Sequence, residues 1–303
     1  DRLLGTFQNN VIVLYGQRRT GKTSILYQLG RVLHDSHVCV LVDMQGKAAR
    51  GLVDFLYSLA DDITYALEDV DIEIALPERE AFQDAPEFFF RSRFLRQVTE
   101  RLQGLSLLLM FDEFEELQAR VEAGKLDSTI FPYLRNLMQH EQKVDFVFAG
   151  THKLEELSTE YWSILFNIAT YKKISFLTEQ EVTRLITEPV APYGLRHDPL
   201  AIRRIHNVTA GQPYFVQLLC HELVAYHNET ERNYLTTYDV EAVLEKIIER
   251  GEAHFKYIWS GATPQERWAL LGTAEHLAHA ETITFAELAA WLRSGEPIDE
   301  EDR

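Results

Sequence analysis

The stretch GQRRTGKT, residues 16 to 23, has the residue types and spacing of a phosphate-binding loop. It fits the pattern G-x-x-x-x-G-K-[ST] through Gly16, Gly21, Lys22 and Thr23. Glycines let backbone N–H groups curl around phosphates, the lysine reaches the β and γ oxygens of a nucleotide, and the threonine hydroxyl ligates Mg²⁺. We therefore predict that the whole loop lines a nucleotide, through Gly16, Gln17, Arg18, Arg19, Thr20, Gly21, Lys22, Thr23 and Ser24.

The surroundings of this loop favour a phosphate site over a chance glycine-rich turn. The apolar run NNVIVLY precedes it and an amphipathic segment follows it, which is the strand–loop–helix setting that the pattern requires. Two positions stay open on sequence alone. Arg18 and Arg19 either assist phosphate binding or are solvated residues of the loop.

A second chemical feature lies in LSLLLMFDEFEEL, where an apolar run ends in acidic residues. A nucleotide-hydrolysing site needs a carboxylate on the metal side and a base that orients the attacking water. Asp112 ends the apolar run and is predicted to hold Mg²⁺, and Glu113 is predicted to polarise the water. The alternative for Glu113 is an acidic cluster that starts a helix, which is how we interpret Glu115 and Glu116.

A third polar position follows the apolar run VDFVFAG, at Thr151 and His152. A polar side chain at such a strand end is suited to hydrogen-bond the γ-phosphate or the attacking water. Thr151, and then His152, are therefore predicted to act in catalysis as sensors of the nucleotide. The alternative for Thr151 is that it caps the next helix.

The elements that must position these residues alternate between short apolar runs and longer amphipathic segments, which predicts an α/β fold with a parallel sheet. The expected strands are 10–15, 37–44, 105–112, 144–150 and 171–177. A helix is expected over 88–102. After Thr178, which forms a capping-box pattern with Glu181, we expect helices and one short strand, TITF (282–285), before the last helix.

Composition limits the possible partners. The 303 residues contain 30 Lys+Arg and 47 Asp+Glu, a net charge of −17, which disfavours nonspecific nucleic-acid binding. Cys39 and Cys220 lie far apart in apolar stretches, a pattern typical of buried thiols in a reducing, cytoplasmic compartment. No apolar stretch approaches the ~20 residues that span a bilayer, so no membrane association is expected.

Together with GQPYF (211–215), these motifs resemble the signal-transduction ATPases with numerous domains (STAND), a branch of the P-loop NTPases close to archaeal-type and AAA+-like ATPases and to origin-recognition initiators. The resemblance implies a P-loop NTPase sheet of order 5-1-4-3-2 over residues 1–177, a helical lid over 178–235 and an incomplete winged-helix-like domain over 236–303. It implies ATP and Mg²⁺ as cofactors, and it places Pro213 near the adenine. Gly211 and Pro213 also fit a simple helix junction. A Gly-Arg element of the family is not evident in DRLLGTF.

The function that the resemblance implies is a slowly hydrolysing ATP switch of STAND type that forms a homo-oligomer with ATP and controls an effector outside this chain. The alternative is a DNA-binding initiator or transposition helper. Charge favours the switch, because Arg293 is the only basic residue near the expected recognition helix. A metabolic kinase finds no support, since nothing resembles a small-molecule acceptor site. Arg135 is a candidate to complete a neighbouring subunit's site, and the preference for ATP over GTP rests on the resemblance.

Overall fold

The structure, a computed structural model, describes residues 11–46, 51–151, 169–280 and 282–294 of the chain. The chain divides into two compact units. The first comprises Asp1–Val182 and Ala210–Tyr214, and the second comprises Thr183–Thr209 and Phe215–Arg303. The division into three domains that the sequence suggests is finer than this and stays a prediction.

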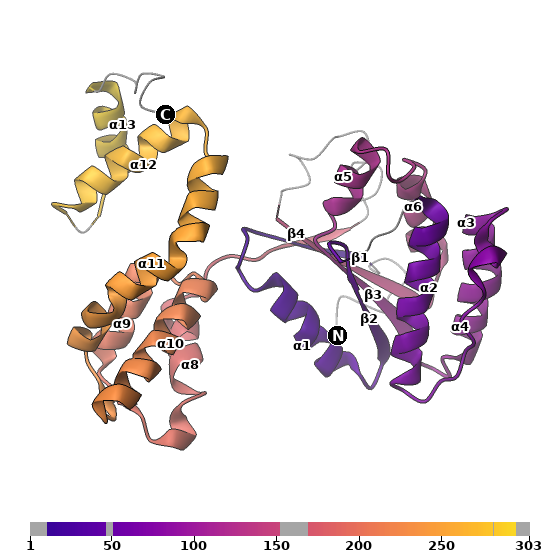
Figure 1. Cartoon of the computed structure of the whole chain (residues 1–303), viewed down its shortest axis with the longest axis horizontal. Helices are drawn as coiled ribbons and strands as arrows, with labels where there is room; N and C mark the ends of the chain where they lie inside the picture. Colours follow the sequence, from indigo (N-terminus) through magenta and orange to yellow (C-terminus); the bar gives the residue numbers. More distant parts are fainter. Residues whose placement is uncertain (1–10, 47–50, 152–168, 281, 295–303) are drawn as a thin grey trace. The chain divides into compact units, whose positions relative to one another are not determined.

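The first unit is built on a parallel sheet of five strands (Figure 1). The strand order is β2-β3-β4-β1-β5, which confirms the predicted order 5-1-4-3-2. All neighbouring strands are parallel, and Asp112 of β3 lies in register with Asp43 of β2 and Ala149 of β4. The strands are β1 (Val11–Tyr15), β2 (His37–Asp43), β3 (Ser106–Asp112), β4 (Val144–Gly150) and β5 (Thr170–Lys173).

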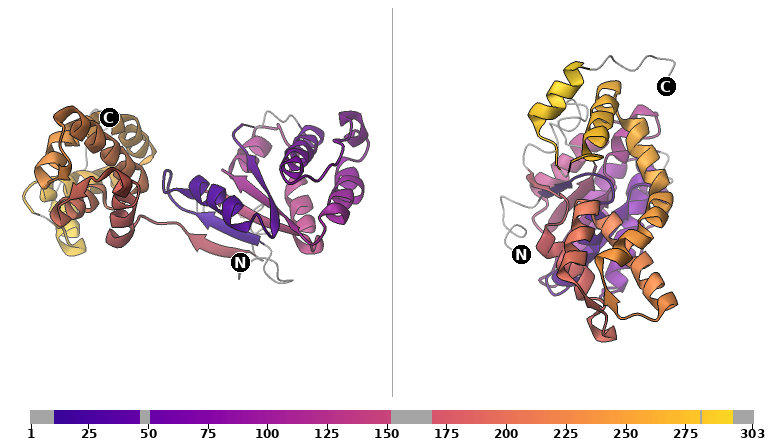
Figure 2. Two further views of the ribbon diagram at one scale, coloured as in Figure 1. Left: turned by 90° about the horizontal axis from the view of Figure 1, so that it is seen from below. Right: turned by 90° about the vertical axis from the view of Figure 1, so that its left-hand side faces the viewer.

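Both faces of this sheet are covered, because alternate residues of each strand point to opposite sides. Val11 and Val13 of β1 join a large apolar core with α2 (Leu52–Glu68) and α6 (Ile130–His140). Ile12 and Leu14 face a smaller core with α1 (Lys22–Leu33). The helices α1 and α2 accordingly lie on opposite faces (Figure 1 and Figure 2). Burial on both sides explains why the strands read as continuous apolar runs.

The helix predicted over 88–102 forms, but its hydrogen bonding changes along its length. It consists of α3 (Pro86–Phe89), a π-helical segment η2 (Phe90–Leu95) and α4 (Arg96–Arg101). The buried side chains Phe90, Phe94 and Val98 are spaced by four, so this face packs into the large core. A 3₁₀ turn η1 (Arg79–Phe82) precedes this helix, and α5 (Glu116–Glu122) follows β3.

The chain after β5 is mainly helical. The predicted capping box is present where α8 begins, because Thr178 N donates to Glu181 Oε2 at 2.8 Å and Glu181 N donates to Thr178 Oγ1 at 3.4 Å. The helices are α8 (Glu179–Thr187), α9 (Pro199–Thr209), α10 (Pro213–Thr230), α11 (Thr237–Gly261), α12 (Pro264–Leu277) and α13 (Phe285–Ser294), with the 3₁₀ turn η3 (Ala191–Tyr193).

Two details of this helical region differ from the sequence analysis. A two-residue parallel ladder joins β6 (Arg196–His197) to β7 (Tyr234–Leu235), which the helical patterns do not predict. The short strand predicted at TITF is wrong: residues 282–284 are irregular and Phe285 begins α13. The cause is a capping box, because Thr284 N donates to Glu287 Oε2 at 2.7 Å and Glu287 N donates to Thr284 Oγ1 at 3.3 Å, which starts a helix where β-branched residues suggest a strand.

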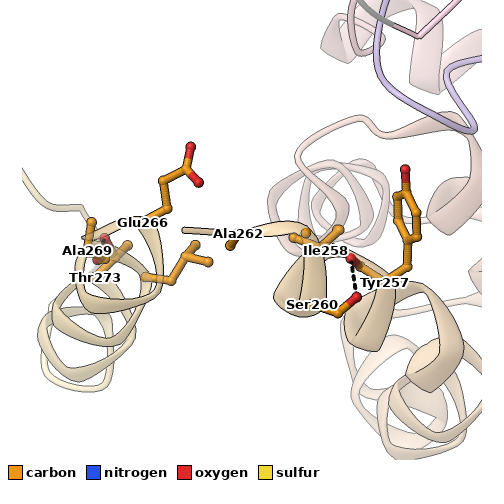
Figure 3. Close-up of a pocket in the computed structure, with 9 residues that line it drawn as sticks. Tyr257, Ile258, Ser260, Ala262, Glu266, Ala269 and Thr273 are labelled. Carbon is orange, nitrogen blue, oxygen red and sulfur yellow. Dashed lines mark hydrogen bonds between the residues drawn. The ribbon is translucent and has the colours of Figure 1, made fainter. Parts of the chain in front are cut away.

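A pocket of about 670 Å³ lies in the second unit between the end of α11 and α12 (Figure 3). Tyr257, Ile258 and Leu270 contribute large apolar side chains to its lining, and Glu266 contributes a carboxylate. No helix within the described ranges is long and apolar enough to cross a bilayer.

Candidate nucleotide-binding site

The predicted chemical residues meet at one edge of the sheet because the carboxyl ends of parallel strands lie on the same side. The phosphate loop follows β1, Asp112 ends β3 and Thr151 follows β4. Backbone hydrogen bonds tie these ends together, since Gly16 N donates to Gly150 O at 3.2 Å and Phe114 N donates to Ala149 O at 3.2 Å. The sheet thus positions the three motifs as one site.

Two glycines of the loop are required for different reasons. A Cβ on Gly16 would lie 2.2 Å from Ile174 O, so only glycine lets the loop pass the end of β5. Gly21 has a φ of +91°, a left-handed conformation that glycine adopts without strain, and it precedes the first turn of α1. These constraints fix the backbone that would surround a phosphate.

Lys22 lies inside the loop rather than in solvent. Its side chain is buried, and Nζ donates to Gly16 O at 2.9 Å and to Gln17 O at 2.8 Å. Burial lowers the pKa of the Lys22 ammonium, while the negative charges of Glu115, Asp112 and Glu113 oppose this shift. An ammonium held by loop carbonyls is a donor set that fits phosphate oxygens.

Thr23 and Asp112 lie 89 positions apart in sequence and are joined by a hydrogen bond, with Thr23 Oγ1 donating to Asp112 Oδ2 at 2.6 Å. The other carboxylate oxygen, Oδ1, accepts from Glu113 N at 3.0 Å. A hydroxyl and a carboxylate are hard oxygen ligands, so the pair fits Mg²⁺. In the described part of the chain no group of three or more His, Cys, Asp or Glu side chains could hold a metal. Mg²⁺ bound together with substrate phosphates needs only one or two protein ligands.

Glu113 has a left-handed backbone, with a φ of +51°. Such a conformation is strained for a residue other than glycine and is often found where function requires it. Burial raises the pKa of the Glu113 carboxyl, and the charge of Glu115 raises it further, whereas Arg18 lowers it. A carboxylate with a raised pKa is the stronger base, which suits the predicted role toward water.

Thr151 is held by Glu115, a residue that the sequence analysis assigns only to the start of a helix. Glu115 Oε1 accepts from Thr151 N at 3.0 Å and from Thr151 Oγ1 at 2.6 Å. Glu115 Oε2 is buried and has no hydrogen-bond partner among the residues that the structure describes. His152, the second predicted sensor, lies outside the described residues.

The remaining loop residues differ in their surroundings. Arg18 and Ser24 are exposed, and Thr20 is buried with its hydroxyl donating to Gln17 O at 2.9 Å. Arg19 has a φ of +63°, and its guanidinium lies 4.0 Å from the centre of the Tyr214 ring. This cation–π contact joins the loop to the GQPYF segment within the first unit.

The GQPYF segment packs closely against the irregular stretch that follows β5, which ends at Lys173 and is shorter than the predicted strand 171–177. Leu177 N donates to Gly211 O at 2.8 Å, and a Cβ on Gly211 would lie 2.0 Å from Leu177 O. Pro213 is the first residue of α10, where a proline fits without loss of a helical hydrogen bond. The segment is therefore a helix junction by geometry, and the role of Pro213 toward adenine stays a prediction.

Sequence reasoning passed over three residues of this region. Glu115 has no local signal that separates it from Glu116. Tyr214 belongs to GQPYF, but only the fold places its ring on Arg19. Asp43 lies in register with Asp112 and follows an apolar run in the same way. That apolar run is the sequence signal by which Asp43 could have been identified. Arg135, the candidate for a neighbouring site, lies on α6.

The AAA domain family matches residues 5–157. None of the curated proteins matches the sequence significantly. The matched residues contain the phosphate loop, the acidic strand and Thr151.

Several solved structures share the fold at low sequence identity. A Walker-type ATPase of Pyrococcus abyssi has a TM-score of 0.63 and 14% identity, covering 96% of this chain and 81% of that one. The ORC2 protein of Aeropyrum pernix in its ADP form has a TM-score of 0.58 and 15% identity, covering 96% and 76%. Cdc6p from Pyrobaculum aerophilum has a TM-score of 0.52 and 16% identity, covering 97% and 76%. The sheet is therefore that of a P-loop NTPase, as predicted.

Proposed function

Because this chain belongs to the AAA domain family, we propose that it binds ATP with Mg²⁺, hydrolyses ATP and acts as a nucleotide-dependent switch of the initiator type. The observation that carries the proposal is the 2.6 Å hydrogen bond between Thr23 and Asp112, which joins the phosphate loop to the acidic strand. Two hard oxygen ligands beside a buried lysine are the donor set that phosphoryl transfer with Mg²⁺ uses in P-loop NTPases.

Each residue of the site has a proposed task. The loop amides and Lys22 bind the phosphates, and Thr23 and Asp112 hold Mg²⁺. Mg²⁺, when bound, neutralises charge on the phosphate oxygens. Glu113 accepts a proton from the attacking water, whose oxygen bonds to the γ-phosphorus. The bond from phosphorus to the β–γ bridging oxygen breaks, and ADP leaves with that electron pair.

The comparisons favour the initiator type over the STAND subclass. Two of the structures described above are a Cdc6p and an ORC2 protein, the latter in its ADP form. The effector outside this chain and the slow rate belong only to the STAND hypothesis.

DNA is the partner that an initiator-type assignment suggests, and the charge of this chain opposes it. The net charge is −17, and Arg293 is the only basic residue of α13. Phosphate contacts by Lys and Arg supply most nonspecific DNA affinity. We therefore propose that ATP controls assembly of the protein with itself and that any DNA binding requires that assembly.

Light scattering behind a sizing column tests this proposal with Glu113→Gln, a variant expected to retain ATP without hydrolysing it. We expect larger assemblies with ATP and Mg²⁺ than with ADP, and a labelled DNA duplex should co-elute only with the ATP assembly. ATP-dependent assembly that never retains DNA would favour the STAND subclass. Identical masses in ATP and ADP would refute the switch and leave a nucleotide-binding scaffold.

A further inference from the structure

Glu115 makes contacts that an exposed helix-starting carboxylate does not make. One oxygen, Oε1, accepts both the amide and the hydroxyl of Thr151, at 3.0 Å and 2.6 Å. The other oxygen, Oε2, is buried and finds no hydrogen-bond partner in the described part of the chain, although burying an unpaired carboxylate oxygen is costly. Its neighbour Glu116 begins α5 and makes no such contact with Thr151 in the described structure. The cost at Glu115 points to a function for this geometry.

The structure leaves little freedom for Glu115 to lie elsewhere. A Cβ on Gly150 would meet Glu115 Oε2 at 2.3 Å and the Phe114 ring at 2.5 Å, so the carboxylate is packed directly on the β4 end. The same Gly150 accepts from Gly16 N at 3.2 Å, which begins the phosphate loop. Glu115 therefore connects the loop after β3 with the end of β4, and the end of β4 is hydrogen-bonded to the start of the phosphate loop.

These contacts decide which hydrogen bonds Thr151 can make. A hydroxyl has one proton and two acceptor lone pairs. In the structure Thr151 donates that proton to Glu115, because an ionised carboxylate can only accept. The Thr151 oxygen is then restricted to accepting hydrogen bonds on its other side. It can receive a proton of a water molecule, and it cannot donate to a phosphate oxygen.

We propose that Glu115 is a positioning residue that orients Thr151 to accept a hydrogen bond from the attacking water. This inference rests on the proposed ATP hydrolysis. The water has two protons, of which Glu113 accepts one during hydrolysis and Thr151 Oγ1 receives a hydrogen bond from the other. The lone pair of the water oxygen is thereby turned toward the γ-phosphorus.

Substitutions at Glu115 separate its geometry from its charge. Glu115→Gln keeps an oxygen that accepts from Thr151, so kcat should stay within a few-fold of wild type. Glu115→Ala removes the acceptor, and kcat should fall about tenfold to a hundredfold, as expected when a reacting group is misplaced by ~1 Å. The Kd for ATP, measured on Glu113→Gln with and without Glu115→Ala, should change little. Glu116→Ala is the matched control, because it removes the same side chain one residue away.

Two further measurements distinguish positioning from a general structural role. Amide hydrogen exchange at Thr151 should accelerate in Glu115→Ala without nucleotide, since the amide loses its acceptor, and should stay protected in Glu115→Gln and Glu116→Ala. Thr151→Val should lower kcat as Glu115→Ala does, Thr151→Ser should retain activity, and the double variant Glu115→Ala with Thr151→Val should be no slower than either single variant.

The outcomes separate this inference from the proposed function. A wild-type protein that does not hydrolyse ATP would refute the proposed function and this inference with it. Normal hydrolysis by wild type together with wild-type kcat in Glu115→Ala would overturn the inference alone. Additive losses in the double variant would also overturn it, because Glu115 would then act independently of Thr151. If Glu115→Ala fails to fold, a wild-type kcat in Thr151→Val would overturn the inference, because a Thr151 hydroxyl without a part in hydrolysis needs no positioning.

Discussion

Replacing Gly16 with alanine tests whether the shape of the phosphate loop controls nucleotide binding. The added Cβ would lie 2.2 Å from Ile174 O and 3.2 Å from Ile174 C, and both are backbone atoms that cannot rotate away. Ordinary contact between carbon and oxygen requires ~3.3 Å, so the loop and the end of β5 must separate by ~1 Å. Overpacking of this kind costs about 1–3 kcal/mol.

The expected consequence is a loss of stability together with a loss of ATP affinity. A cost of about 1–3 kcal/mol lowers Tm by roughly 2–12 °C in a unit of this size. Displacement of the loop also moves the carbonyls of Gly16 and Gln17 that hold Lys22. We expect ATP affinity to fall at least about tenfold, which is the loss of one hydrogen bond to a charged group. Differential scanning calorimetry and titration calorimetry measure the two effects.

Gly30→Ala provides a matched control for this variant. Its Cβ would meet only Cys39 Cβ at 3.8 Å, an ordinary contact, and Gly30 lies within α1. Alanine is favoured over glycine inside a helix by about 0.5–1 kcal/mol, so this variant should be as stable as wild type or more stable. If Gly16→Ala melts like Gly30→Ala and binds ATP as wild type does, the steric argument for the loop is refuted.

Further predictions concern the metal side, the base and a buried helix cap. Asp112→Asn should weaken Mg²⁺-dependent ATP binding, measured by titration calorimetry, whereas Glu113→Gln should bind ATP normally and lose phosphate release. Equal phosphate release by Glu113→Gln and wild type would place the base elsewhere. Thr236→Ala should destabilise the second unit by about 1 kcal/mol in urea unfolding, because it removes the capping box with Asp239. Burial alone would raise the pKa of Asp239, but hydrogen bonds from Thr236 and the charges of His227 and Arg232 lower it. The stability that its charge contributes is therefore present above pH ~3.9 and is lost as the pH falls through the lowered pKa, so wild type and Asp239→Asn should differ at pH 7 and converge in strong acid.

The phosphate loop and the sheet could be predicted because their signals are local. Gly16, Gly21 and Lys22 lie within seven residues, and the strands are buried on both faces, so each appears as an apolar run. The meeting of Thr23 with Asp112 across 89 residues followed from the strand order that the family resemblance implies. Local chemistry and one topological rule were therefore sufficient to predict that these residues meet, and their roles toward a nucleotide stay predictions.

The parts that could not be predicted depend on contacts between distant segments. Nothing next to Glu115 in sequence separates it from Glu116, and its role appears only when β4 places Thr151 beside it. The ring of Tyr214 reaches Arg19 only through the turn at Gly211. The strand predicted at TITF does not form, and here the cause is local. The helix cap at Thr284 outweighs the β propensity of the neighbouring residues.

Titration of Mg²⁺ and ATP into wild type and Lys22→Ala tests the central claim most directly, because the claim is that this loop binds the nucleotide phosphates. The buried Lys22 ammonium lies on two loop carbonyls, at 2.9 Å and 2.8 Å, where phosphate oxygens would take their place. We predict that wild type binds ATP and that Lys22→Ala binds at least several-fold more weakly while its far-UV circular dichroism is unchanged. Equal affinity in the two folded proteins would contradict the assignment of the phosphate loop and the function built on it.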